Sequence, residues 1–113
     1  MTMRGTYFDP GRLRHEMALQ QAVRVADALG GQTETWQTLA TVWAHLVPAT
    51  ASPLRRADGE EAEITHHVVL RADARVQRGM RLATAARIFP IRAVRDLDET
   101  GRYLLCLTRE ETP

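Results

Sequence analysis

The last third of the chain constrains the fold most. Two apolar runs of strand length, RIFPIRAV at residues 87–94 and YLLCLT at residues 103–108, lie on either side of DLDETG. Short apolar runs bounded by turn-forming residues are typical of buried β-strands. Gly101 permits the tight backbone that such a connection needs. We therefore predict a β-hairpin here, and nothing in this segment resembles a catalytic motif.

Other strands are predicted upstream. Apolar residues from Leu13 to Val23 share one parity and polar residues share the other, which indicates a half-buried strand. ADALGG at residues 26–31 then predicts a loop whose glycines can take positive φ. Further strands are expected at Ile64–Arg71 and Met80–Ala83, with a connection over residues 76–79.

The segment at residues 35–47 fits two structures. Apolar residues recur at i, i+3, i+4 and i+7, which favours an amphipathic helix. The same stretch also fits a strand, with Trp36, Ala40, Val42, Ala44 and Leu46 on one side and Leu39, Trp43 and Val47 on the other. Residue pattern without further information would predict the helix.

Two segments are predicted to leave the body of the fold. Residues 1–12 form an extended N-terminal arm with a turn at Asp9-Pro10-Gly11. Residues 48–62, PATASPLRRADGEEA, combine prolines, small residues and mixed charges, so we expect a long mobile loop. Ser52 and Pro53 can open one short helix there, because proline suits a first helical position.

Composition excludes several classes of protein. A chain of 113 residues is expected to form one domain, residues 1–113. Its net charge of +1 gives no field for gripping nucleic acid. The single cysteine, Cys106, excludes an internal disulfide and points to synthesis in a reducing cytoplasm. No apolar run approaches the ~20 residues of a membrane span.

Several segments in their order along the chain resemble the phage head-closure proteins, also called stopper or head-tail joining proteins. The resemblance covers roughly residues 11–110 and is carried by a set of short matches. These are LRHEMALQQ, TVWAHLVP, ITHHVVLR, GMR, IFPIRAV and TGRYLLCL. Ala83-Thr84 departs from the aromatic residue often found after GMR, and the loop has no clear family signature.

The resemblance implies an all-β fold, a small β-barrel of SH3-like or OB-like size with one long loop. It also implies that residues 35–47 are a strand. The implied function is structural and not enzymatic: a ring of six or twelve copies in the virion of a tailed phage or a gene transfer agent. That ring would lie between a portal or adaptor ring and a tail terminator ring, with packaged double-stranded DNA in its channel.

Candidate contact residues follow from this interpretation. The loop would lie at the channel or between subunits, where opposite charges can pair with a neighbouring copy. Its candidate residues are Leu54, Arg55, Arg56, Glu60 and Glu61. Possible subunit contacts outside the loop are His66, His67 and Arg102.

Sites for chemistry have weaker support. His66 and His67 are adjacent, so on a strand they point to opposite faces and cannot share a metal ion. Cys106 lies in an apolar run and is expected to be a buried hydrophobe. We therefore predict no catalytic residue, cofactor or metal. The predicted core includes the following residues: Trp43, Phe89, Ile91, Leu105 and Leu107.

Three alternative functions remain open. The chain could be another connector subunit, either the adaptor, which is usually helical, or the tail terminator. It could also be a β-barrel that binds nucleic acid or a peptide, although its arginines are dispersed over nearly every segment. An enzyme is the third alternative, and no acid-base constellation supports it.

Overall fold

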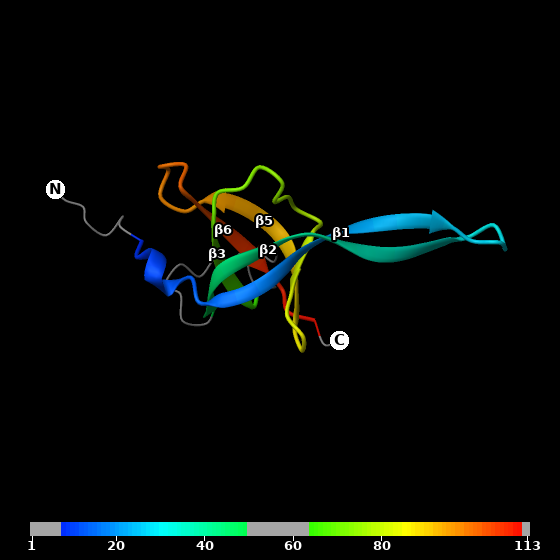
Figure 1. Cartoon of the computed structure of the whole chain (residues 1–113), viewed down its shortest axis with the longest axis horizontal. Helices are drawn as coiled ribbons and strands as arrows, with labels where there is room; N and C mark the ends of the chain where they lie inside the picture. Colours follow the sequence, from blue (N-terminus) through cyan, green and yellow to red (C-terminus); the bar gives the residue numbers. More distant parts are fainter. Residues whose placement is uncertain (1–7, 50–63, 112–113) are drawn as a thin grey trace.

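The structure, a computed structural model, describes residues 8–49 and 64–111. Six strands form a closed barrel in the order β1-β2-β3-β6-β5-β4, and all neighbouring strands are antiparallel (Figure 1). The strands are β1 (His15–Ala26), β2 (Gln32–Pro48), β3 (His66–Arg71), β4 (Arg81–Ala83), β5 (Ile88–Asp96) and β6 (Tyr103–Thr108). The predicted all-β barrel is confirmed. No helix within the described ranges is long and apolar enough to cross a membrane.

The predicted C-terminal hairpin is present. β5 pairs with β6, and Gly101 in the turn between them has a φ of 79°. β5 also contains Pro90, next to an irregularity in the register between Ile91 and Ala93. Proline cannot donate to a ladder, so it is tolerated in strands mainly at edges and bulges. On its other side β5 pairs with the three-residue β4, which joins β1 and closes the barrel.

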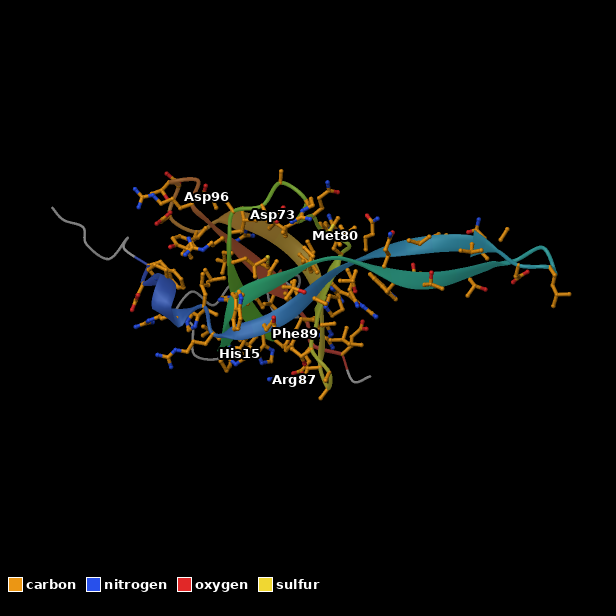
Figure 2. The ribbon with its side chains drawn as sticks, in the orientation of Figure 1. His15, Asp73, Met80, Arg87, Phe89 and Asp96 are labelled. Carbon is orange, nitrogen blue, oxygen red and sulfur yellow. The ribbon has the colours of Figure 1, made fainter. Side chains whose placement is uncertain are left out.

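The core fills the barrel interior. Phe89, which is labelled in Figure 2, is its largest fully buried side chain. Burying apolar surface stabilises the fold by about 25 cal/mol per Å². The buried cluster consists of Met17, Leu19, Ala44, Val68, Leu70, Val76, Leu82, Phe89, Ile91 and Cys106.

β2 settles the ambiguity of residues 35–47 in favour of a strand. It pairs with β1 over residues 32–44 and with β3 from Ala44 to Pro48, and helical periodicity alone cannot reveal this pairing. Leu19 pairs with Ala40 and Gln20 pairs with Thr38, so Leu39 is an extra residue in β2. This bulge turns Leu39 toward the core. The predicted faces therefore hold only beyond the bulge, where Val42, Ala44 and Leu46 point inward.

The prediction that Trp43 is buried is wrong. Its neighbours in β2 point inward, so Trp43 points out of the barrel and is 54% exposed. Phe89, Ile91 and Leu107 are buried as predicted. Leu105 is only half-buried, although Leu107, which lies on the same face of β6, is buried.

The two longest strands continue beyond the barrel as a ribbon. β1 pairs with β4 only from Ala18 to Gln20, and β2 pairs with β3 only from Ala44 to Pro48. Residues 20–38, which we call the ribbon, therefore project away from the barrel as a two-stranded hairpin (Figure 1). At its tip, Asp27 Oδ1 accepts hydrogen bonds from the backbone N–H groups of Leu29 and Gly31, both at 2.9 Å.

The predicted turn at Asp9-Pro10-Gly11 is also present. Residues Pro10–Arg12 form a 3-10 helical turn, η2, and the carboxylate of Asp9 accepts from the N–H of Gly11. Phe8 packs against the rings of His45 and Tyr103 on the outside of the barrel. Most of the predicted loop at residues 48–62 lies outside the described residues. At its edge, the N–H of Ala49 donates to the carbonyl of Thr65 at 2.8 Å.

Candidate assembly site

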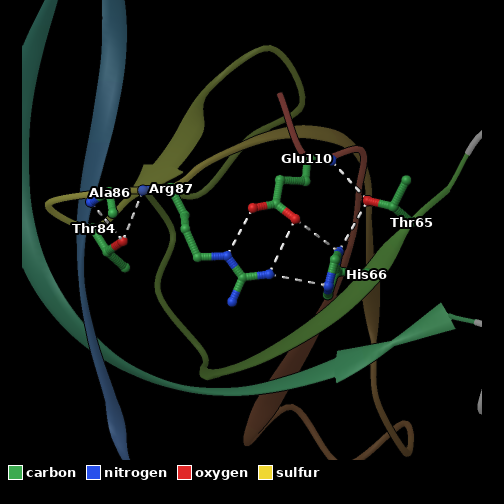
Figure 3. Close-up of polar contacts among 6 residues, drawn as sticks. All are labelled: Thr65, His66, Thr84, Ala86, Arg87 and Glu110. Carbon is green, nitrogen blue, oxygen red and sulfur yellow. Dashed lines mark hydrogen bonds and ion pairs between the residues drawn. The ribbon is translucent and has the colours of Figure 1, made fainter. Parts of the chain in front are cut away.

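A polar cluster lies at the barrel end where β2 leaves and β3 begins. Arg87, from the β4–β5 turn, binds Glu110, which follows β6 (Figure 3). Arg87 Nε donates to Glu110 Oε2 at 2.7 Å and Nη2 donates to Oε1 at 3.0 Å. Such a bidentate pair fixes orientation as well as adding charge-assisted bonds. It lowers the pKa of Glu110 and raises that of Arg87, in both cases mainly through their hydrogen bonds.

His66, the first residue of β3, completes this cluster. Arg87 Nη2 lies 3.4 Å from His66 Nε2, and since a guanidinium only donates, Nε2 is an acceptor. The proton of the neutral ring is then on Nδ1, which donates to Thr65 Oγ1 at 3.0 Å. Burial, more than the neighbouring Arg87 and His67, lowers the pKa of His66, and Glu110 opposes this shift. His66 is therefore neutral at pH 7.

Further contacts connect the cluster to the barrel. The N–H of Glu110 donates to Thr65 Oγ1 at 2.7 Å, and the buried hydroxyl of Thr108 donates to the carbonyl of His66 at 2.9 Å. Both the His66 ring and the Arg87 guanidinium pack on the ring of Phe89. The cluster thus holds together the start of β3, the C-terminal segment and the β4–β5 turn, directly beside the root of the long loop.

The opposite barrel end has a different chemistry. Figure 2 shows Arg87 and Asp96 at the two ends of β5. In the β5–β6 turn, Asp96 accepts from the N–H of Gly101, and Asp98 accepts from the N–H and hydroxyl of Thr100. The bond from the Thr100 hydroxyl is the main reason that the pKa of Asp98 is lowered. These carboxylates form the turn, as the sequence predicted.

Among the predicted contact residues that the structure describes, His66, His67 and Arg102 are not brought together. His66 belongs to the cluster and its side chain is 14% exposed, whereas His67 points to the other face of β3. Arg102 is exposed at the far end of the barrel, where its carbonyl accepts from the N–H of Ala72. The candidate loop residues Leu54, Arg55, Arg56, Glu60 and Glu61 lie outside the described residues.

Sequence reasoning missed Arg87, Glu110 and Thr65. Each stands outside a strand in a segment with no recognisable motif, and they meet only because the barrel closes. One signal for this cluster was available in the sequence. Residues 65–67 (THH) lie at the start of β3 and residues 109–111 (REE) follow β6, and antiparallel pairing of these strands brings the two segments together.

Chemical sites are also addressed by the structure. Cys106 is completely buried, and burial raises the pKa of its thiol to about 12, so it is a core residue as predicted. Within residues 8–49 and 64–111, no three His, Cys, Asp or Glu side chains gather as metal ligands.

Comparisons with known proteins address the family. The model of the phage head completion protein family matches residues 8–111. A protein chain in the virion of a native gene transfer agent particle is 34% identical, with 88% of this chain and 96% of that one covered and a TM-score of 0.62. A protein of Shigella flexneri 2a, known from its solution structure, shares the fold at 23% identity, with 91% and 96% coverage and a TM-score of 0.65. No curated protein matches this chain.

The family match spans the whole described barrel and both of its ends. It confirms the resemblance to head-closure proteins that short segments of the sequence carry. The chain belongs to the phage head completion protein family and is a structural component of a phage or phage-like virion.

Proposed function

We propose that this protein forms a ring in the head-tail connector, below the portal and adaptor, where it closes the DNA-filled head and provides the surface on which the tail terminator docks. The family match over residues 8–111 carries this proposal. The similarity to a chain in a gene transfer agent virion supports it. The all-β fold does not suit the helical adaptor.

The architecture is consistent with a mechanical role. A closed barrel is a rigid body whose strands have no free edges along the closed part. A net charge of +1 neither attracts nor repels DNA strongly, which suits a channel through which DNA must pass. The protein acts by position and contact, and we propose no catalysis.

The long loop is the proposed channel element. The candidate loop residues lie in the sequence between Ala49 and Thr65, which are hydrogen-bonded to each other, next to the strand ends held by the Arg87–Glu110 pair. Because these contacts fix the barrel end next to the loop, the loop starts from the same position in every copy of a ring. We propose that Arg55 and Arg56 meet acidic groups of the next copy or DNA phosphates, and that Leu54, Glu60 and Glu61 lie in the same contact. The contact roles of His66, His67 and Arg102 also stay predictions.

Deletion of residues 54–61 tests the channel role. The barrel should still fold, because its strands, core and polar cluster lie outside the deletion. Particles should contain the protein but lose DNA or fail to join tails, as measured by packaged DNA per head and by electron microscopy. A matched control exchanges the same residues for an uncharged Gly/Ser segment of equal length, which separates loop chemistry from loop length. Full heads and normal tail joining with the deletion would contradict the proposal.

A further inference from the structure

The ribbon has two chemically different faces. Its strand pairing puts Gln21 opposite Gln37, Val23 opposite Thr35 and Val25 opposite Thr33. These six residues, the inner face of the ribbon, have the same parity in β1 as Met17 and Leu19, so they continue the surface that lines the core. The inner face carries no charge. The other face carries the exposed ion pair of Arg24 with Glu34.

The ribbon lacks the protection that such structures need. A two-stranded hairpin alone is marginally stable in water, and natural proteins cover long exposed strand edges or block them with charged residues and proline. Here Val25 is 51% exposed and Leu29, at the tip, is 95% exposed. The ribbon contains one arginine, Arg24, and two carboxylates, Asp27 and Glu34. It therefore does not form a basic surface that could bind DNA.

The direction of the ribbon is fixed at its base. Arg81 of β4 lies with its guanidinium carbon 4.2 Å from the centroid of the Trp36 ring, and its Nε donates to Gln20 Oε1 at 2.7 Å. In a cation–π contact of this kind, the guanidinium is attracted to the face of the aromatic ring. The ribbon is therefore presented by the barrel in a defined orientation, which lowers the entropy cost of binding.

A surface on the described part of the barrel wall carries side chains that suit contact with the inner face. Ala18 lies between Thr41 and Ala83 in the register, and all three point outward because Met17, Leu19, Val42 and Leu82 point inward. With Trp43 they form a surface of small and aromatic side chains, which we call the wall patch: Ala18, Thr41, Trp43 and Ala83. Glu16, which pairs with Trp43, and Arg81, two residues before Ala83, flank this patch. Within the described residues, Val25, Leu29 and Trp43 are the exposed large hydrophobic side chains. All three therefore belong to the ribbon or to the wall patch.

We propose that the inner face of the ribbon binds the wall patch of a second copy of this chain. Val25 pairs with Thr33, which lies ten residues before Trp43 in the extended strand β2, or roughly 30 Å away. The inner face of a chain therefore cannot reach the wall patch of the same chain. The contact joins two different surfaces and is therefore heterologous, which builds rings when the rotation between copies closes. This inference rests on the proposed ring function and identifies the surfaces that would form the ring.

The contact is too small to hold two free copies together. The inner face spans residues 21–25 of β1, which is about 17 Å of strand, and a two-stranded ribbon is about 10 Å wide, so each copy buries about 170 Å² of ribbon. Stable interfaces bury about 800 Å² per partner. We therefore expect the free chain to be monomeric and the contact to form on the assembled connector, where each copy is held beside the next.

Matched charge substitutions test the inner face. Val25→Glu puts a carboxylate on the inner face, while Ala26→Glu puts one on the opposite face at the next residue. Trp43→Ser removes the largest side chain of the wall patch. Val25→Glu and Trp43→Ser should each lower incorporation into particles at least tenfold, whereas Ala26→Glu should leave it unchanged. All three should fold, because the positions are exposed, and thermal melting of the purified chains checks this. Normal incorporation of Val25→Glu would overturn the proposal.

Photo-crosslinking identifies the occupant. Benzoylphenylalanine at Val25, in particles assembled from equal amounts of ¹⁵N-labelled and unlabelled chain, should crosslink to the segment around Trp43 of a differently labelled copy. Crosslinks to another virion protein, or within one copy, would overturn the proposal while leaving the ring function intact. Absence of the unmodified protein from purified particles would instead contradict the proposed function itself.

Discussion

The barrel and the ribbon are made from the same two strands, yet they differ in what supports them. In the barrel part, β1 has β2 on one side and β4 on the other, and it buries Met17 and Leu19 completely. In the ribbon, the same strand has only β2 beside it, and Val25 is half exposed. Strand pairing alone therefore buries little surface. Stability comes from closing the barrel, and the ribbon is left available for contact with other molecules.

Thiol reactivity should separate the two regions most strongly. In a Leu29→Cys variant, the introduced thiol lies at the ribbon tip, while Cys106 is fully buried and its pKa is raised to about 12. The introduced thiol should react with a thiol reagent at least ~10³-fold faster, because Cys106 must wait for the barrel to open. The time course of labelling near pH 8 measures both rates. Similar rates for the two thiols would show that the barrel is loosely packed.

Truncation of the core is the next largest effect. Phe89→Ala should lower the free energy of unfolding by about 3–5 kcal/mol, because the ring is completely buried and its truncation leaves a cavity in the core. Denaturant unfolding measures the loss. An unchanged midpoint would mean that Phe89 is not a central core residue.

Two ion pairs compare barrel and ribbon directly. A double-mutant cycle with Arg87→Gln and Glu110→Gln should give a coupling of about 0.5–1 kcal/mol, after allowing for solvent screening of these partly exposed side chains. The same cycle with Arg24→Gln and Glu34→Gln should give a coupling near zero, since that pair is more exposed and its charged atoms are 3.8 Å apart. Equal coupling energies for the two pairs would show that the polar cluster does not make the Arg87–Glu110 pair stronger than an exposed ion pair.

The polar cluster should also make stability depend on pH. The pKa of His66 is lowered from 6.5 in the folded state, so the unfolded chain binds the proton more readily. The stability from neutral His66 is fully present above pH 6.5 and is lost as the pH falls below it toward the lowered folded value. Unfolding curves at about pH 7.5 and about pH 5 measure this. His45 shifts in the same direction, so a variant with His45→Gln and His66→Gln should show a smaller loss.

The smallest effect is expected at the ribbon tip. Leu29→Ser should change the free energy of unfolding of the free chain by no more than about 0.5 kcal/mol, because Leu29 is 95% exposed. Denaturant unfolding alongside Phe89→Ala provides the comparison. A large loss would show that the tip packs against the barrel in solution.

The sequence by itself determined the β-class, the C-terminal hairpin and the burial of Phe89 and Cys106. These features depend on alternation, turn residues and strand-length apolar runs, which are local. The family could also be recognised from short segments in order. Residues 35–47 could not be assigned from their own pattern, because helical and strand periodicities coincide there, and it was the family resemblance that favoured the strand.

Only the tertiary structure decided the rest. The bulge at Leu39 shifts the alternation within β2, and the closed barrel puts Trp43 on its outside wall. The cluster of His66, Arg87 and Glu110 exists because β3, the β4–β5 turn and the segment after β6 meet at one barrel end. Contacts between residues so far apart in sequence depend on how the strands pair. No local pattern encodes that pairing, since every strand pattern is compatible with many neighbours.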